Sequence, residues 1–105
     1  MCRSLSPDLF MVEMALTSDA VLFDVRTADE IRRQPALEGA LQLDVLSDRF
    51  DRALEAWDRH RPYFLYCDTG KRSRMACTMM AERGFVHLSY LAGGLAAWQK
   101  EQNLT

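Results

Sequence analysis

The sequence predicts an α/β protein built around a mostly parallel sheet. Residues 21–25 and 62–66 are short, continuous apolar runs of the kind that form buried strands. Segments with helical spacing of apolar residues lie between such runs, and the alternation continues along the whole chain. The 105 residues suffice for one domain, which we place at residues 1–105, either whole or cut from a longer protein.

The first half of the chain contains two helix starts and a brief strand. Ser6 before Pro7 predicts a helix, since serine caps the first turn and proline fits the first helical position. Apolar residues at helical spacing follow, namely Leu9, Val12, Ala15 and Leu16. Thr27 and Glu30 form a capping-box pattern, which predicts a second, short helix. Residues 39–43 are typical of a brief strand.

The second half contains three more helices and a last strand. Residues 47–60 predict an amphipathic helix whose apolar face is made by Phe50, Leu54 and Trp57. The loop 67–72 runs directly into another helix, which should end at Gly84 because glycine favours the position after a helix. Residues 85–91 contain the last strand, and a terminal helix follows it.

Composition argues against several classes of function. Apolar residues make up 49% and charged residues 27% of the chain, as in ordinary globular proteins. A net charge of −2 gives no global attraction for nucleic acid. No apolar run is long enough to span a membrane, and the first residues lack the core of a signal peptide. We therefore expect no nucleic-acid or membrane partner and a cytoplasmic location.

Cysteines and histidines are few and scattered. The three cysteines, Cys2, Cys67 and Cys77, form no C-x-x-C pair, which argues against a disulfide framework and for a reducing compartment. Cys2 lies in an end that we expect to fray, and Cys77 lies on a helix face that we expect to pack. His60 and His87 are isolated from other metal ligands, so we expect no metal and no cofactor.

Cys67 carries the clearest chemical signal. It follows a predicted strand and precedes a helix, which is where open α/β sheets bind ligands. Amides at a helix start carry partial positive charge, and Lys71 and Arg72 add full charges, so thiolate is favoured over thiol. Gly70 lets the backbone curl so that amides converge on the sulfur. A cysteine that merely closes a strand does not require such a loop.

A cysteine phosphatase is the nearest alternative with a similar loop. Those enzymes place five residues between cysteine and arginine, whereas four residues separate Cys67 from Arg72. One residue fewer removes an amide and shrinks the cradle, which then suits one sulfur better than a tetrahedral oxyanion. We therefore rank a phosphatase or arsenate reductase below a sulfur-carrying cysteine.

Residues 67–73, Cys-Asp-Thr-Gly-Lys-Arg-Ser, closely resemble the active-site loop of rhodanese domains, C-x-x-G-x-R-S. Three further segments resemble other parts of that family in the same order. They are residues 22–26 (its D-V-R strand, followed by the acidic pair Asp29-Glu30), residues 37–40 (its H-I-P-G-A segment) and residues 91–98 (its closing G-G-x-x-x-W). Each segment alone is a weak signal, but four in order form a strong one.

The resemblance implies a three-layer fold with a five-stranded, mostly parallel sheet flanked by helices. It implies a sulfurtransferase in which Cys67 carries a sulfane sulfur as a persulfide, from thiosulfate or a persulfide donor to cyanide, a thiol or a protein acceptor. Arg72 would be a framework residue paired with a carboxylate such as Asp24, and Arg26 would support the same corner. The persulfide would be held by the backbone amides of Asp68, Thr69, Gly70, Lys71, Arg72 and Ser73.

The sequence departs from the family pattern in two places. Residues 34–40 lack the usual histidine, which affects the geometry of that corner. Asp68 places a carboxylate beside an anion site, where its charge would weaken thiosulfate binding by about 1 kcal/mol and favour a persulfide donor. A rhodanese-like module that binds or regulates without turnover is the alternative function, and the presence of Cys67 favours the enzyme.

Overall fold

The centre of the protein is a five-stranded sheet in the order β1-β5-β4-β2-β3, seen in a computed structural model that describes residues 2–102. All four neighbouring pairs are parallel, which confirms the predicted α/β class. The strand before Cys67, β4, lies in the middle of this sheet. The strands are β1 (Cys2–Leu5), β2 (Val21–Asp24), β3 (Leu41–Gln42), β4 (Pro62–Tyr66) and β5 (His87–Leu91).

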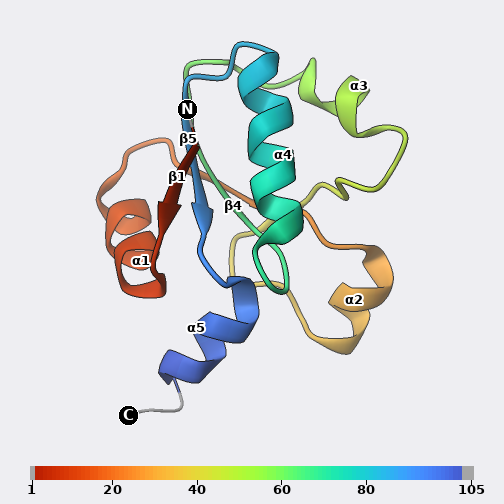
Figure 1. The fold of residues 1–105 in the computed structure, drawn as a ribbon. Helices are drawn as coiled ribbons and strands as arrows, with labels where there is room; N and C mark the ends of the chain where they lie inside the picture. The colour runs from red at the N-terminus through yellow and green to blue at the C-terminus, as the bar shows by residue number, and fades with distance from the viewer. Residues whose placement is uncertain (1, 103–105) are drawn as a thin grey trace.

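Helices cover both faces of the sheet (Figure 1). The helices are α1 (Pro7–Leu16), α2 (Ala28–Arg33), α3 (Phe50–Leu54), α4 (Lys71–Glu82) and α5 (Gly94–Gln102). Helices α1 and α5 pack on one face, where Phe10 and Leu95 join a core cluster with the sheet residues Leu22 and Phe64. Helices α3 and α4 cover the other face. The result is the three-layer arrangement that the sequence predicts.

Several predicted helix signals are confirmed in detail. Ser6 Oγ accepts a hydrogen bond from Leu9 N–H at 3.4 Å, and Pro7 opens α1. The capping box of α2 is complete, with Thr27 as the cap and Glu30 reaching back to it. Gly84 follows α4 with a left-handed φ of +89°.

The apolar pattern of α1 predicts the helix but not the face that packs. Leu9, Val12 and Leu16 are exposed, and Leu16 keeps 80% of its surface in solvent. Phe10 is fully buried instead, with Met14 packed against the same cluster. The face of α1 that packs on the sheet is therefore the one that carries Phe10 and Met14, which are four residues apart.

The helix predicted over residues 47–60 is much shorter in the structure. Only Phe50–Leu54 is helical, and the flanking segments form turns. Ser47 Oγ accepts from Arg49 N–H at 3.1 Å, and Asp58 Oδ1 accepts from His60 N–H at 2.8 Å. These short side chains compete for backbone amides and so limit the helix. Phe50 and Leu54 are buried as predicted, and Trp57 packs partly against the core.

The N-terminal segment corrects two predictions about cysteines. Residues Cys2–Leu5, expected to fray, form edge strand β1 beside β5. Cys2 is joined to Cys77 of α4 by a disulfide whose Cα atoms are 5.9 Å apart, so the prediction that the three cysteines form no disulfide is wrong. The cytoplasmic location that this argument supported stays a prediction. None of the helices within residues 2–102 has the length and apolar character that crossing a membrane requires.

Candidate active site

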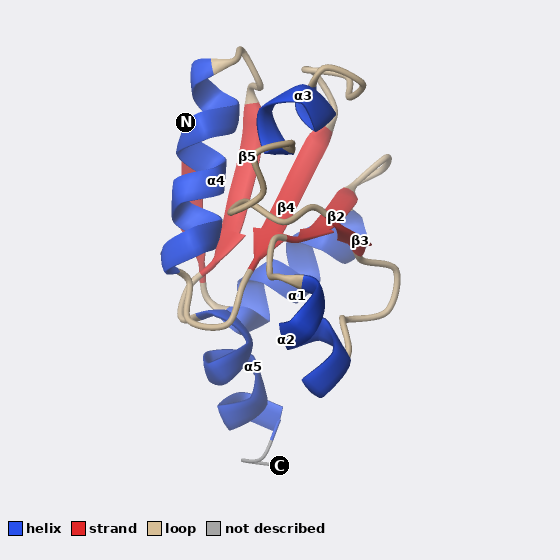
Figure 2. Cartoon of the chain, turned by 90° about the vertical axis from the view of Figure 1, so that its right-hand side faces the viewer, coloured by secondary structure: helices blue, strands red, loops and turns tan. Residues whose placement is uncertain are grey.

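Cys67 lies at the carboxyl end of the central strand β4, immediately before the loop that leads into α4. Helices α2 and α5 lie at the same end of the sheet, as Figure 2 shows. This is the edge where parallel α/β sheets place their ligand sites. Cys67 is fully buried and is the free cysteine of the described chain.

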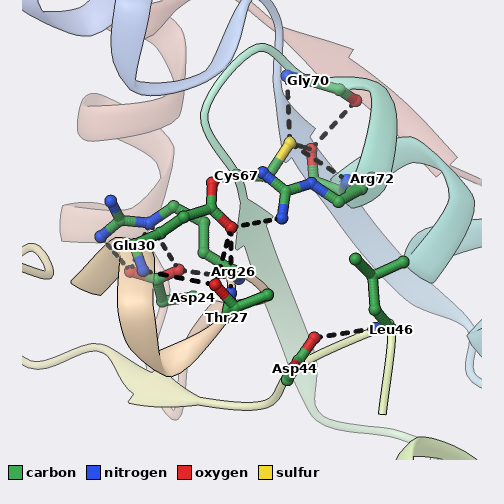
Figure 3. Close-up of polar contacts among 10 residues, drawn as sticks. Asp24, Arg26, Thr27, Glu30, Asp44, Leu46, Cys67, Gly70 and Arg72 are labelled. Atoms are coloured by element: carbon green, nitrogen blue, oxygen red, sulfur yellow. Dashed lines mark hydrogen bonds and ion pairs between the residues drawn. The ribbon is translucent and has the colours of Figure 1, made fainter. Parts of the chain in front are cut away.

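Two backbone amides donate to the sulfur of Cys67 (Figure 3). Gly70 N–H lies 3.1 Å from Sγ and Ser73 N–H lies 3.3 Å from it. Ser73 Oγ is 3.5 Å from the same sulfur and donates its proton to the Gly70 carbonyl at 3.1 Å. Donors aimed at one sulfur favour negative charge on it or on a sulfur attached to it.

Gly70 is required for the curl of this loop. Its φ is +100°, a conformation that side-chain-bearing residues rarely adopt. A Cβ at this position would also lie 3.1 Å from the backbone nitrogen of Gly93. The sequence-based assignment of a turning glycine at this position agrees with the structure.

The start of α5 holds the other side of the loop. Leu95 N–H donates to the Cys67 carbonyl at 2.9 Å, and Ala96 N–H donates to the Asp68 carbonyl at 3.0 Å. A Cβ on Gly94 would lie 2.4 Å from the Asp68 carbonyl oxygen, so only glycine allows this approach. The closing glycines therefore act on the active-site loop directly.

Arg72 pairs with Glu30 of α2, which corrects the predicted partner Asp24. Its two terminal nitrogens donate to Oε1 at 2.5 Å and to Oε2 at 2.6 Å (Figure 3). These hydrogen bonds from Arg72 lower the pKa of Glu30 from 4.5 to about 2, and the bond from Thr27 N–H adds to this effect. The ion pair ties the first turn of α4 to the first turn of α2.

The carboxylate of Asp24 forms its ion pair with Arg26 instead. Arg26 Nε and a terminal nitrogen donate to the Asp24 carboxylate at 3.0 Å and 2.7 Å. Tyr66 Oη donates to the same carboxylate at 2.7 Å. The pKa of Tyr66 is raised mainly by burial and further by this hydrogen bond to Asp24. Arg26 is only 1% exposed, so the cluster is structural support beneath the loop. It lies at the ends of β2 and β4.

The corner that lacks the family histidine is held by the same tyrosine. Leu37 N–H donates to Tyr66 Oη at 2.9 Å, which joins residues 34–40 to the end of β4. The hydroxyl thus donates to Asp24 and accepts from Leu37. This connection supplies an anchor for the corner without a histidine.

The exposed loop residues lie between two grooves. Lys71 and Thr69 line a groove of about 210 Å³ on one side of the loop. Asp68 lines another of about 200 Å³ on the other side, together with Glu30 and Arg33. Within residues 2–102 no group of three His, Cys, Asp or Glu residues is arranged to hold a metal ion.

The sequence matches the model of the rhodanese-like domain family over residues 11–101. The chain belongs to the rhodanese-like domain family. A protein named sulfurtransferase from Allochromatium vinosum is 29% identical over 100 residues, covering 95% of this chain and 91% of that protein. Thiosulfate sulfurtransferase GlpE from Actinobacillus succinogenes is 31% identical over 88 residues, covering 84% of this chain and 77% of that protein.

Solved rhodanese-like structures share the fold. The rhodanese-like domain of a protein from Anabaena superposes with a TM-score of 0.79 at 24% identity, covering 96% of this chain and 76% of that one. The five-stranded rhodanese-like fold that the motifs imply is therefore confirmed. The relatives place this rhodanese-like chain in the sulfurtransferase family.

Sequence reasoning missed two parts of this rhodanese-like site. The sequence predicts Glu30 as a capping residue and as part of the acidic pair of the family, but not as the partner of Arg72. An acid in the first turn of a helix is a usable signal for such a pairing. The amides of Leu95 and Ala96 left no signal of their own, but the Gly93-Gly94 pair before them marked a close backbone approach.

Proposed function

We propose that this rhodanese-like domain is a sulfurtransferase in which Cys67 carries the transferred sulfur as a persulfide. The observation that supports this most is the position of Sγ at the end of β4, where the amides of Gly70 and Ser73 both donate to it. A thiolate is stabilised by such donors, and so is the terminal sulfur of a persulfide.

The first half-reaction loads the cysteine. The Cys67 thiolate attacks the outer sulfur of thiosulfate, a new sulfur–sulfur bond forms, and sulfite leaves with the electron pair of the broken bond. A persulfide donor reacts in the same way and releases its thiolate. In the second half-reaction an acceptor, cyanide or a thiolate, attacks the outer sulfur, and Cys67 leaves as a thiolate.

The loop residues divide these tasks. The amides of Gly70 and Ser73 donate to Sγ, and we expect the remaining amides of residues 68–73 to help hold the outer sulfur of the persulfide. Arg72 acts through Glu30 as a positioning residue for the loop, and the Asp24–Arg26 pair supports the floor beneath it. Asp68 carries an exposed carboxylate beside the loop, which favours an uncharged or singly charged persulfide donor over doubly charged thiosulfate.

A catalytically quiet binding or regulatory module is the second candidate. The full burial of Cys67 favours it, because a donor must enter the loop before it can reach the sulfur. The outer sulfur of a persulfide lies about 2 Å beyond Sγ, which brings it closer to the loop surface. The two candidates therefore differ in whether Cys67 loads.

Thiocyanate formation from thiosulfate and cyanide tests the proposed function. We expect turnover by the wild type and none by Cys67→Ala, since the variant keeps the loop and lacks the carrier. Ser18→Ala, which changes an exposed hydroxyl in the turn after α1, serves as the control for handling and folding. Equal turnover by wild type and Cys67→Ala would refute a role for this cysteine.

A further inference from the structure

The groove of about 210 Å³ beside the loop collects polar groups from four parts of the fold. Lys71 and Arg74 come from α4, Thr69 from the loop, Tyr90 from β5 and Ser4 from β1. It therefore extends from the mouth of the active-site loop across the carboxyl ends of the two strands beyond β4.

The two cations of this groove have no anionic partner in the described chain. The ion pairs within residues 2–102 involve Arg3, Arg26, Arg32, Arg72 and Arg83. Lys71 and Arg74 are in none of them, and no hydrogen bond from either side chain is formed within that range. Two unneutralised cations that line one groove attract an anion into it.

The groove on the opposite side of the loop has a different charge. Two of its charged residues are already paired, Glu30 with Arg72 and Arg26 with Asp24. The other two are Asp68 and the cation Arg33, so the charges of this groove largely cancel. An anionic molecule that approaches Cys67 therefore meets no net attraction in this groove and is attracted on the side of Lys71 and Arg74.

The width of the groove, which is set by the spacing of the strands, determines how long an anion must be to span it. Ser4 pairs with Tyr90, and Tyr90 pairs with Leu65 of β4, so Ser4 lies two strands away from the strand that carries Cys67. Two strand spacings amount to about 10 Å. In thiosulfate the charged oxygens are bonded next to the transferred sulfur, so they stay beside the loop. A carboxylate joined to its thiol through a carbon chain can reach the far wall.

We propose that this groove binds the carboxylate of a small thiol that accepts sulfur from Cys67. The proposal rests on the sulfurtransferase function proposed above and names its acceptor class. The bound thiolate attacks the outer sulfur of the Cys67 persulfide and forms a new sulfur–sulfur bond. Cys67 leaves as a thiolate with the electron pair of the broken bond, and the acceptor departs as a persulfide. Lys71 and Arg74 hold the carboxylate, and the Tyr90 hydroxyl donates to it.

The test measures single-turnover discharge of the persulfide form by glutathione and by its diethyl ester. Both carry the same thiol, but the ester lacks the two carboxylate charges. We compare variants by the ratio of the discharge rate with glutathione to the rate with the ester. This ratio cancels differences in loading or in folded fraction among variants. We expect Arg74→Gln to lower this ratio about fivefold, which corresponds to the largest contribution that an exposed ion pair usually makes. We expect Tyr90→Phe to lower the ratio less. Arg33→Gln, a cation removed from the opposite groove, should leave the ratio unchanged.

The outcomes separate this proposal from the function on which it rests. If the wild type never loads a sulfur, the proposed function fails and this proposal fails with it. If the wild type loads and the ratio is the same in Arg74→Gln, only the groove assignment is overturned. If Arg74→Gln instead slows loading from thiosulfate and leaves the ratio unchanged, the groove serves the sulfonate of the donor and the acceptor assignment is wrong.

Discussion

At the scale of single residues, Glu30 has two roles, because it caps α2 and also binds Arg72 in the first turn of α4. Its Oε1 accepts from Thr27 N–H at 3.1 Å, which completes the cap of α2, and from Arg72 at 2.5 Å. Its other oxygen, Oε2, accepts a hydrogen bond from the second terminal nitrogen of Arg72. The carboxylate thus sets the start of one helix and anchors the loop that leads into another. The cap was predictable because it is local, whereas the pairing with Arg72 depends on how the strands are ordered.

This double role predicts an acid-sensitive stability. The pKa of Glu30 is lowered to about 2, first by the hydrogen bonds from Arg72, so the folded state resists protonation. The stabilisation is fully present above the ordinary pKa near 4.5 and is lost as the pH falls toward 2. It amounts to at most about 3 kcal/mol. Urea unfolding should therefore show Glu30→Gln less stable than wild type at neutral pH, with the gap closing at acid pH.

Asp29→Asn is the matched control for that experiment. Asp29 precedes Glu30 on the same helix turn and pairs only with exposed Arg32 on the surface. We expect a change of less than about 1 kcal/mol at neutral pH. A gap between wild type and Glu30→Gln that stays constant from neutral to acid pH would contradict the assigned ion pair.

At the scale of elements, local patterns predicted what local forces build. The buried strands β2 and β4, the capped start of α2 and the loop 67–73 were readable, because composition or capping fixes each within a few residues. Strand β1 was missed because two of its four residues are polar and exposed and only Leu5 is buried. It is a strand only through its pairing with β5, which sequence periodicity does not reveal.

Helix α5 gives a prediction at this scale, because its first residue touches the active-site loop. An alanine at Gly94 would place Cβ 2.6 Å from the Cys67 carbonyl oxygen, at a φ of +63°. We expect Gly94→Ala to lose about 2–4 kcal/mol of unfolding free energy and most of the sulfur-transfer activity, because the loop must move. Thermal or denaturant unfolding and the thiocyanate assay measure both losses.

Gly39→Ala separates backbone strain from the effect on the loop. Gly39 also has a left-handed φ, +84°, but a Cβ there would have no atom within 4 Å. This variant should lose about 1 kcal/mol and keep its activity. Equal losses in the two variants would mean that α5 does not position the loop.

At the scale of the whole molecule, the sheet order explains why the site forms where it does. Strands β2, β4 and β5 are neighbours, and a helix begins shortly after the carboxyl end of each. Helix α4 supplies an amide to the sulfur, α5 supplies amides to the loop carbonyls, and α2 supplies the carboxylate that holds Arg72. Three helix starts therefore converge on one loop, where α4 donates to the sulfur and α5 and α2 hold the loop in place.

The sequence was sufficient for the fold class and for the position of Cys67 at the end of a central strand, and insufficient for the contacts between elements. Cys67 and its loop are contiguous, so the turn at Gly70 and the start of α4 could be predicted from the residues. The pairing of Arg72 with Glu30, the disulfide of Cys2 with Cys77 and the approach of Gly94 join residues far apart in the chain. Such contacts depend on the order of the strands, which no local pattern encodes.

The most direct test of this account is the mass of the intact protein after treatment with thiosulfate and, separately, with a persulfide donor. The account predicts that the wild type gains one sulfur, that the sulfur maps to the peptide containing Cys67, and that Cys67→Ala gains none. A wild type that gains no sulfur from either donor, or that gains it only at Cys2 or Cys77, would contradict Cys67 as the sulfur carrier.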